Sequence, residues 1–156
     1  MRFKGDIIIT DPCYIIRDED NGMVPLTHND WHSCHCGRNM EVLGIKNYIS
    51  RSTEYGDWSC TTYNTDTEEI IGEFCADAGM VSVFLLDEVL SYNPNFDYHK
   101  KRKWTTTWIK DFDGEVEFKV IYEDWLDEES GKVLSDKVVH VVGNGNINFD
   151  TRQTGF

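Results

Sequence analysis

The chain has 156 residues, of which 40% are hydrophobic and 13% aromatic; this suffices for one domain with a hydrophobic core and excludes a disordered chain. Its 28 acidic residues against 15 basic ones give a net charge of -13, which excludes long-range attraction to duplex nucleic acid or to an anionic membrane. No apolar run approaches the roughly 20 residues of a membrane-spanning helix, no signal peptide is recognised, and five cysteines without framework spacing predict reduced thiols in a cytoplasm.

The first predicted element is a strand that ends at residue 10. Ile7, Ile8 and Ile9 are consecutive and β-branched, which predicts a strand buried on both faces. Pro12 cannot donate a hydrogen bond to a neighbouring strand, and it restrains Asp11 to extended geometry. The strand should therefore stop at this point, with the Asp11 carboxylate at its end. A buried strand that ends in this way can form the wall of a pocket.

A short helix and a hairpin are expected next. Thr27–Asp30 has the form of a capping box with Asp in place of Glu, which predicts a helix over residues 28–37. Residues 48–55 and 58–64 are rich in aromatic side chains and threonine, and they flank Gly56-Asp57. This pattern predicts two strands joined by a hairpin turn.

Two further strands and one helical turn follow. Residues 68–75 and 80–86 read as strands separated by the turn residues 76–79, and the second strand is nearly all apolar, which predicts a central position. Residues 87–92 predict one helical turn before the break at Asn93–Asn95.

The last third of the chain predicts a meander. Residues 104–111 and 115–122 flank Asp113-Gly114, a strong hairpin signal. Residues 123–131 read as an acidic turn, and residues 133–142 as the third strand of the meander. In the second strand of this meander, apolar residues alternate with charged ones, so that one face should be buried: Val116, Phe118 and Val120.

About eight strands and one or two short helices define the expected fold. It is α+β and mainly β, a single globular domain over residues 1–156. The sheet should be antiparallel and close into a partly open barrel or a sandwich.

The densest set of potential metal ligands lies in the first predicted helix. His28 and His32 are four residues apart and share a helical face, and His32 and His35 are three apart, so that two imidazoles can point at one ion. Cys36 is a further candidate, as is Cys34. However, Cys-x-Cys differs from the Cys-x2-Cys knuckle, and a polar turn with reduced thiols explains the same residues.

Three acids at predicted strand ends form a second candidate site. If Asp11, Asp57 and Asp77 converge, they can hold a divalent cation or act as general acid and base. Ordinary turns use the same residue types. An enzyme would rely on these three acids together with His32.

Known catalytic motifs are absent from the sequence. It has no nucleophile elbow, Walker loop, His-Glu-x-x-His or His-x-Thr motif. Cys13 or Cys75 with His140 would be a thiol nucleophile and its base, although buried cysteines in strands are usually inert. We therefore expect no cofactor, and the pattern favours a protein without enzymatic activity.

A basic cluster near aromatic rings is the third candidate site. Lys100–Lys103 is followed by Trp104 and Trp108, which places cations beside large π-faces, the combination that holds a phosphate and stacks a base. Arg152 can add a donor at the same rim. A solvated loop that balances the acids of residues 123–129 explains the cluster equally well.

Several segments of the chain resemble a loose group of small phage and bacterial proteins. That group carries an Asp-Pro-Cys-Tyr strand end, a Tyr-Gly-Asp-Gly turn and an Asp-Ala-Gly strand start. The corresponding residues here are 5–14, 53–57 and 75–81, and the ending over 141–149 and 153–156 also looks phage-like.

The resemblance implies a phage or mobile-element accessory protein made in the bacterial cytoplasm. Trp58 stands where that group usually has Gly. Small acidic phage proteins include antagonists of host defence that sequester a nucleotide-derived signal, often as homo-oligomers. Others degrade such a signal, bind and inhibit a host protein, or form part of the virion.

The expected function is a sponge for a nucleotide-type ligand. The alternatives are a hydrolase for the same signal, and an acidic protein that binds a host protein or belongs to the virion. In the sponge hypothesis the tryptophan rings stack on a nucleobase, and the lysine and arginine side chains neutralise the phosphate. The expected ligand-binding residues are Asp11, Tyr14, Asp77, Lys101, Arg102, Lys103, Trp104, Trp108 and Arg152.

Overall fold

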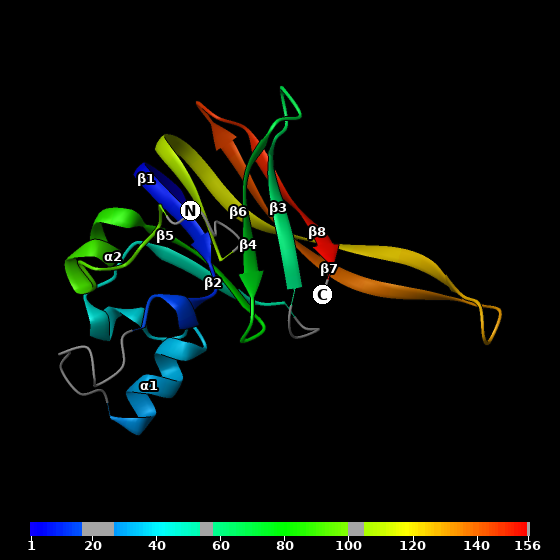
Figure 1. Cartoon of the computed structure of the whole chain (residues 1–156), viewed down its shortest axis with the longest axis horizontal. Helices are drawn as coiled ribbons and strands as arrows, with labels where there is room; N and C mark the ends of the chain where they lie inside the picture. The colour runs from blue at the N-terminus through cyan, green and yellow to red at the C-terminus, as the bar shows by residue number, and fades with distance from the viewer. Residues whose placement is uncertain (17–26, 54–57, 100–104, 156) are drawn as a thin grey trace.

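The computed structural model describes residues 1–16, 27–53, 58–99 and 105–155. These residues form one eight-stranded antiparallel sheet with two short α-helices, which confirms the mainly β class predicted from the sequence (Figure 1). The sheet is not closed, and its strand order is β2-β5-β1-β6-β7-β8-β3-β4. None of the described helices is long and apolar enough to cross a membrane.

The elements follow one another along the chain as β1 (Arg2–Thr10), η1 (Pro12–Tyr14), α1 (His28–His35), η3 (Met40–Leu43), β2 (Tyr48–Ser52), β3 (Trp58–Asn64), β4 (Ile70–Ala76), β5 (Met80–Leu85), α2 (Leu86–Tyr92), β6 (Thr106–Asp127), β7 (Lys132–Gly145) and β8 (Phe149–Gly155).

Strand β1 lies between two hydrophobic cores. Ile7, Ile8 and Ile9 are all fully buried, as their β-branched run predicts. Since successive side chains of a strand point to opposite faces, Ile7 and Ile9 enter one core and Ile8 enters the other. Strands β5 and β6 pair with the two edges of β1, so that its backbone is satisfied on both sides.

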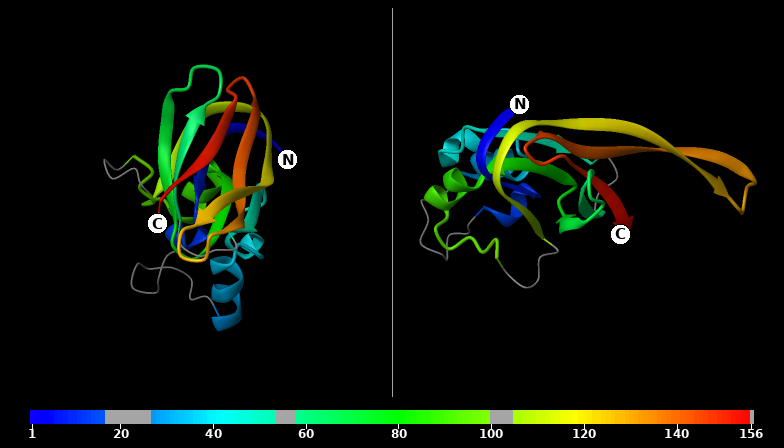
Figure 2. Two further views of the ribbon diagram at one scale, coloured as in Figure 1. Left: turned by 90° about the vertical axis from the view of Figure 1, so that its right-hand side faces the viewer. Right: turned by 90° about the horizontal axis from the view of Figure 1, so that it is seen from above.

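The sheet curls strongly, and the larger core fills its concave side. Strand β4 packs against β6, although the two are far apart in the strand order (Figure 2). A hydrogen bond of 3.0 Å between the hydroxyls of Thr62 and Thr107 joins β3 to β6, which are not neighbours in the strand order. The smaller core lies on the outer face of β1 and β5, under α1, α2, η1 and η3.

The predicted helices are present. The hydroxyl of Thr27 accepts from the amide of Asp30 at 3.1 Å, which is the expected N-cap, and the helix ends at His35. Helix α2 ends at Tyr92, one residue before the break. Both helices are short, with eight residues in α1 and seven in α2.

The predicted hairpin between residues 48–55 and 58–64 is wrong. Strand β2 pairs with β5, and β3 pairs with β4 and β8, so the two strands lie in separate parts of the sheet. The Gly56-Asp57 dipeptide lies outside the described residues. Both strands contribute to the larger core, β2 through Ile49 and β3 through Trp58 and Cys60, so burial in that core does not make them neighbours in the sheet.

The predicted turn at Asp113-Gly114 is also wrong. Strand β6 runs without interruption through these residues, pairing with β1 on one edge and with β7 on the other. A glycine is required at 114 because the β7 backbone approaches closely: a Cβ there would collide with the carbonyl oxygen of Asn144 and lie 2.6 Å from the Cα of Gly145. The meander does place β7 beside β6, and Val116 is buried as the alternation predicts.

We expect the substitution Gly114→Ala to lower the free energy of unfolding by about 2–3 kcal/mol, because the added Cβ forces two paired backbones apart. Urea unfolding followed by circular dichroism measures this change. The matched control is Glu117→Ala, at an exposed position of the same strand, for which we expect a change within about 0.5 kcal/mol. Equal stability of the two variants would contradict the close approach.

Candidate functional site

Asp11 is a buried carboxylate that joins the end of β1 to the turn before β5. Its Oδ1 accepts from the backbone amide of Cys13 at 3.0 Å. Its Oδ2 accepts from the amides of Ala78 at 2.7 Å and Met80 at 3.3 Å, and the side chain is fully buried. Both oxygens therefore bind the backbone, so the geometry gives Asp11 a structural role.

Two further predicted site residues, Tyr14 and Asp77, lie near this carboxylate. The Tyr14 hydroxyl donates to Oδ2 of Asp77, which belongs to the same turn that Asp11 holds. Burial, and then the hydrogen bond to Asp77, raises the pKa of Tyr14 above its usual range, so the hydroxyl is a neutral donor at physiological pH. Asp57, the third acid expected here, lies outside the described residues.

The buried thiols near this turn are protonated at neutral pH. Burial, followed by the charge of Asp11, raises the pKa of Cys13 above its usual range. Burial also raises the pKa of Cys75, and raises that of Cys60 to about 12. His140 lies on β7 and lines a different cavity, which neither Cys13 nor Cys75 lines. This arrangement does not activate a thiol nucleophile.

The basic cluster of residues 100–104 lies outside the described residues, so its ligand-binding role stays a prediction. Trp108 is described: its indole Nε1 donates to Oδ2 of Asp6 at 3.2 Å, and Tyr98 and His99 pack edge-to-face against its ring. The cavity beside this ring is about 100 Å³, smaller than the roughly 300 Å³ at which small-molecule pockets begin.

Arg152 lies on β8 and is engaged by its neighbours. Its guanidinium lies over the ring of Tyr63, 4.5 Å from the centroid. It also forms ion pairs with Glu68 at 3.3 Å and Asp150 at 3.5 Å. Two carboxylates thus already neutralise this cation, and its predicted role in ligand binding stays untested.

Aromatic packing holds the histidines of α1. Trp31 stacks on His35 with centroids 4.7 Å apart and meets His32 edge-on at 5.2 Å. Cys34 is buried, and burial raises its pKa to about 11. The side chain of His28 is not among those described, and the described residues contain no group of three or more metal-binding side chains. The predicted metal ligands were His28, His32, His35 and Cys36.

A projecting two-stranded ribbon is the feature that sequence reasoning missed. The distal parts of β6 and β7, residues 122–137, extend far from the rest of the molecule (Figures 1 and 2); we call this segment the ribbon. The exposed fractions of Tyr122, Leu126 and Val133 are 69%, 61% and 68%. Trp125 and Leu134 are also exposed.

Both faces of the ribbon carry apolar side chains. Leu126 lies opposite Val133, and Trp125 lies opposite Leu134. Cross-strand partners share a face and successive residues alternate, so the two pairs occupy opposite faces of the ribbon. The ribbon also carries two bases, Lys132 and Lys137, against six acids: Glu123, Asp124, Asp127, Glu128, Glu129 and Asp136.

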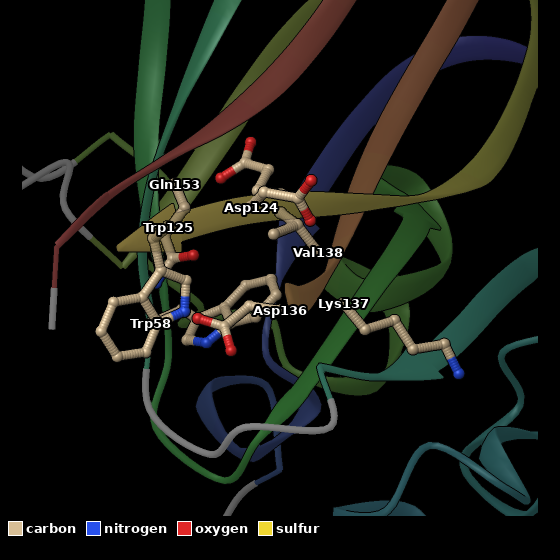
Figure 3. A pocket seen from close by; sticks show the side chains of 8 residues that line it. Trp58, Asp124, Trp125, Asp136, Lys137, Val138 and Gln153 are labelled. Carbon is tan, nitrogen blue, oxygen red and sulfur yellow. The ribbon is translucent and has the colours of Figure 1, made fainter. Parts of the chain in front are cut away.

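A pocket lies where the ribbon leaves the body of the protein. It has a volume of about 380 Å³, and Trp58 and Trp125 both line it (Figure 3). The ring of Trp58 is 4% exposed and belongs to the larger core, whereas Trp125 is 45% exposed. The other lining residues are Glu123, Asp124, Asp136, Lys137, Val138 and Gln153. We name this cavity the acidic-aromatic pocket.

One sequence signal for the ribbon was available. The alternating stretch ends at Val120, and residues 121–126 then contain four more large apolar or aromatic side chains. They indicate that the strand continues into the segment that was predicted to be an acidic turn. The pocket had no comparable signal, because Trp58 and Trp125 come from distant parts of the chain.

Comparisons of the chain with protein-family models, with curated proteins and with solved structures gave no match. The interpretation of the site therefore depends on its own geometry and chemistry.

We expect Asp11→Ala to lower the free energy of unfolding by about 2–4 kcal/mol, because three backbone amides lose their buried acceptor. Urea unfolding measures the loss. Asp77→Ala is the matched control in the same turn, and it should cost less because it removes only the contact with the partly exposed Tyr14. If Asp77→Ala costs as much as Asp11→Ala, Asp11 does not hold the turn.

The raised pKa of Cys60 predicts alkaline destabilisation. Below pH 9 the thiol is protonated in both states; above pH 9 the unfolded thiol ionises while the folded one keeps its proton up to a pKa of about 12. In this window the unfolding free energy should fall by up to about 1.4 kcal/mol per pH unit for that thiol. Urea unfolding between about pH 8 and about pH 10.5 should show a shallower decline for Cys60→Ala than for the wild type, because the other thiols with raised pKa values contribute to both proteins alike. Parallel declines would contradict the prediction.

Proposed function

We propose that this chain is a protein-binding protein that docks a basic partner protein through the ribbon. The observation that carries this proposal is the exposure of large apolar side chains on a segment that projects away from both cores. Large apolar side chains that gather on an exposed segment commonly mark a protein interaction site.

The energetics of the ribbon support a binding role. Full burial of an aliphatic or aromatic side chain is favourable by about 1.5–3 kcal/mol. Leu126 and Val133 gain less than half of this within the chain, since each is more than 60% exposed. A partner that covers both faces of the ribbon would recover it, and the cross-strand hydrogen bonds would keep the side chains preorganised.

Charge selects the kind of partner. The ribbon has six acids and two bases, within a chain of net charge -13. A second copy of the chain would bring like charges together, whereas a basic protein surface would be attracted and oriented. In the phage setting that the resemblance implies, the partner would be a basic host protein, including one whose basic surface binds nucleic acid.

Nucleotide sequestration stays a prediction. We prefer the ribbon because Asp11 and Asp77 bring carboxylates, which repel phosphate, to the place where Tyr14 lies. The cations expected to neutralise phosphate lie outside the described residues. Incubation with cyclic nucleotides, followed by removal of free ligand and mass spectrometry of what the heated protein releases, tests that prediction separately.

We expect the double substitution Leu126→Ser and Val133→Ser to abolish capture of a basic protein from a bacterial lysate while leaving thermal stability unchanged. Both side chains are exposed, so the fold does not depend on them. The matched control is Ile70→Ser, since Ile70 has the same 61% exposure as Leu126 but lies on β4. Mass spectrometry identifies the captured protein, and calorimetry with the purified partner measures affinity.

For the purified partner, we expect at least about tenfold weaker binding by the double variant than by the Ile70→Ser variant. Raising the salt concentration from about 0.05 M to about 0.3 M should weaken wild-type binding several-fold. Unchanged affinity of the double variant contradicts the proposal. A homodimer that the double variant dissociates, seen by light scattering, would assign the ribbon to self-association instead.

A further inference from the structure

We infer that the acidic-aromatic pocket binds a guanidinium group, namely the side chain of an arginine presented by the partner. The inference rests on the proposed function for the source of this arginine, and it names the chemistry that the pocket recognises. The apolar contacts of the ribbon do not explain this pocket.

Two indole rings give the pocket its affinity for a cation. Trp58 and Trp125 line the same cavity of about 380 Å³ (Figure 3). The face of an indole attracts a cation through its quadrupole, and tryptophan is the strongest of the aromatic residues in this respect. Trp125 is partly exposed, so a ligand can reach its ring, while Trp58 is held in place by the core.

Carboxylates complete the recognition of a cation. Glu123, Asp124 and Asp136 line the pocket, and in Figure 3 the carboxylate of Asp136 lies beside the two rings. Lys137 is the single base among the described residues that line the cavity, and its ammonium extends away from the rings. Glu123 and Asp136 are cross-strand partners, so their like charges repel one another, and a bound cation would relieve this repulsion.

The chemistry of the lining, with indole rings beside carboxylates, favours guanidinium over ammonium. A guanidinium is planar, stacks on an aromatic face, and can donate two parallel hydrogen bonds to one carboxylate. It is also more weakly hydrated than an ammonium, so less free energy is lost when it enters the pocket. The amide of Gln153 at the rim offers one further acceptor.

The position of the pocket couples it to the ribbon. Trp125 contributes to both: it belongs to the apolar pair with Leu134 on the ribbon, and it lines the cavity. A partner that covers the ribbon therefore passes the mouth of the pocket. An arginine at that point of the partner would fix the register of the complex.

The test uses the full chain and three short peptides in nuclear magnetic resonance titrations. The peptides are acetyl-Gly-X-Gly-amide, in which X is arginine, its neutral analogue citrulline, or lysine. The indole N–H signals of Trp58 and Trp125 are assigned from Trp58→Phe and Trp125→Phe variants. We expect the arginine peptide to shift the Trp125 signal saturably, the citrulline peptide to leave it unchanged, and the lysine peptide to bind at least about threefold more weakly.

Asp136→Asn should weaken binding of the arginine peptide at least about fivefold, because the substitution removes one negative charge from beside the rings while it keeps the size of the side chain. Glu117→Gln removes an exposed charge elsewhere on β6 and should leave the affinity unchanged. The inference is overturned by equal binding of arginine and citrulline, by equal binding of arginine and lysine, by the absence of a saturable shift, or by unchanged affinity of Asp136→Asn.

The two proposals fail separately. Ribbon-dependent capture of a partner without binding of the arginine peptide would overturn the inference alone. Binding of the arginine peptide without any ribbon-dependent partner would overturn the proposed function and leave a free cation site.

Discussion

The structure depends on the burial of β1 on both of its faces. Full burial of each isoleucine at positions 7, 8 and 9 is favourable by about 1.5–3 kcal/mol, which holds only if a hydrophobic layer covers each face of the strand. The curled sheet supplies one layer, and the helices supply the other. Asp11 stabilises the end of this strand by accepting amide hydrogen bonds from the turn before β5. Strands β5 and β6 are then placed by pairing with β1.

The same constraint explains why the ribbon is available for binding. The larger core reaches along β7 as far as Val138 and Val139, and residues 122–137 extend beyond it. An isolated two-stranded hairpin is marginal in water, so apolar side chains that cover no core add little to the stability of the fold. Contact with another molecule explains why these apolar side chains are present on an exposed segment. The acids of the ribbon keep the segment hydrated until such contact occurs.

Sequence reasoning succeeded where the physics is local. The cap at Thr27, the helical turn predicted over residues 87–92 and the strand at Ile7–Ile9 are each indicated by near neighbours in the chain. It failed at Asp113-Gly114, because a glycine that permits close approach of two backbones is identical in the sequence to a glycine that permits a turn. It paired β2 with β3 because turn residues indicate where a chain bends, without showing which strand becomes the neighbour.

By itself, the sequence determined the composition of the site. The chain has a strongly negative net charge, many acidic residues and large aromatic side chains, and its pattern is mainly β. Tertiary structure alone decided which aromatics line one pocket. Trp58 and Trp125 line the same cavity because β3 pairs with β8, β8 with β7 and β7 with β6, which brings together residues distant in sequence. Tertiary structure also decided that Leu126 and Val133 stay exposed. An alternating strand is buried only where the rest of the protein covers it, and the length of the core is a property of the whole fold.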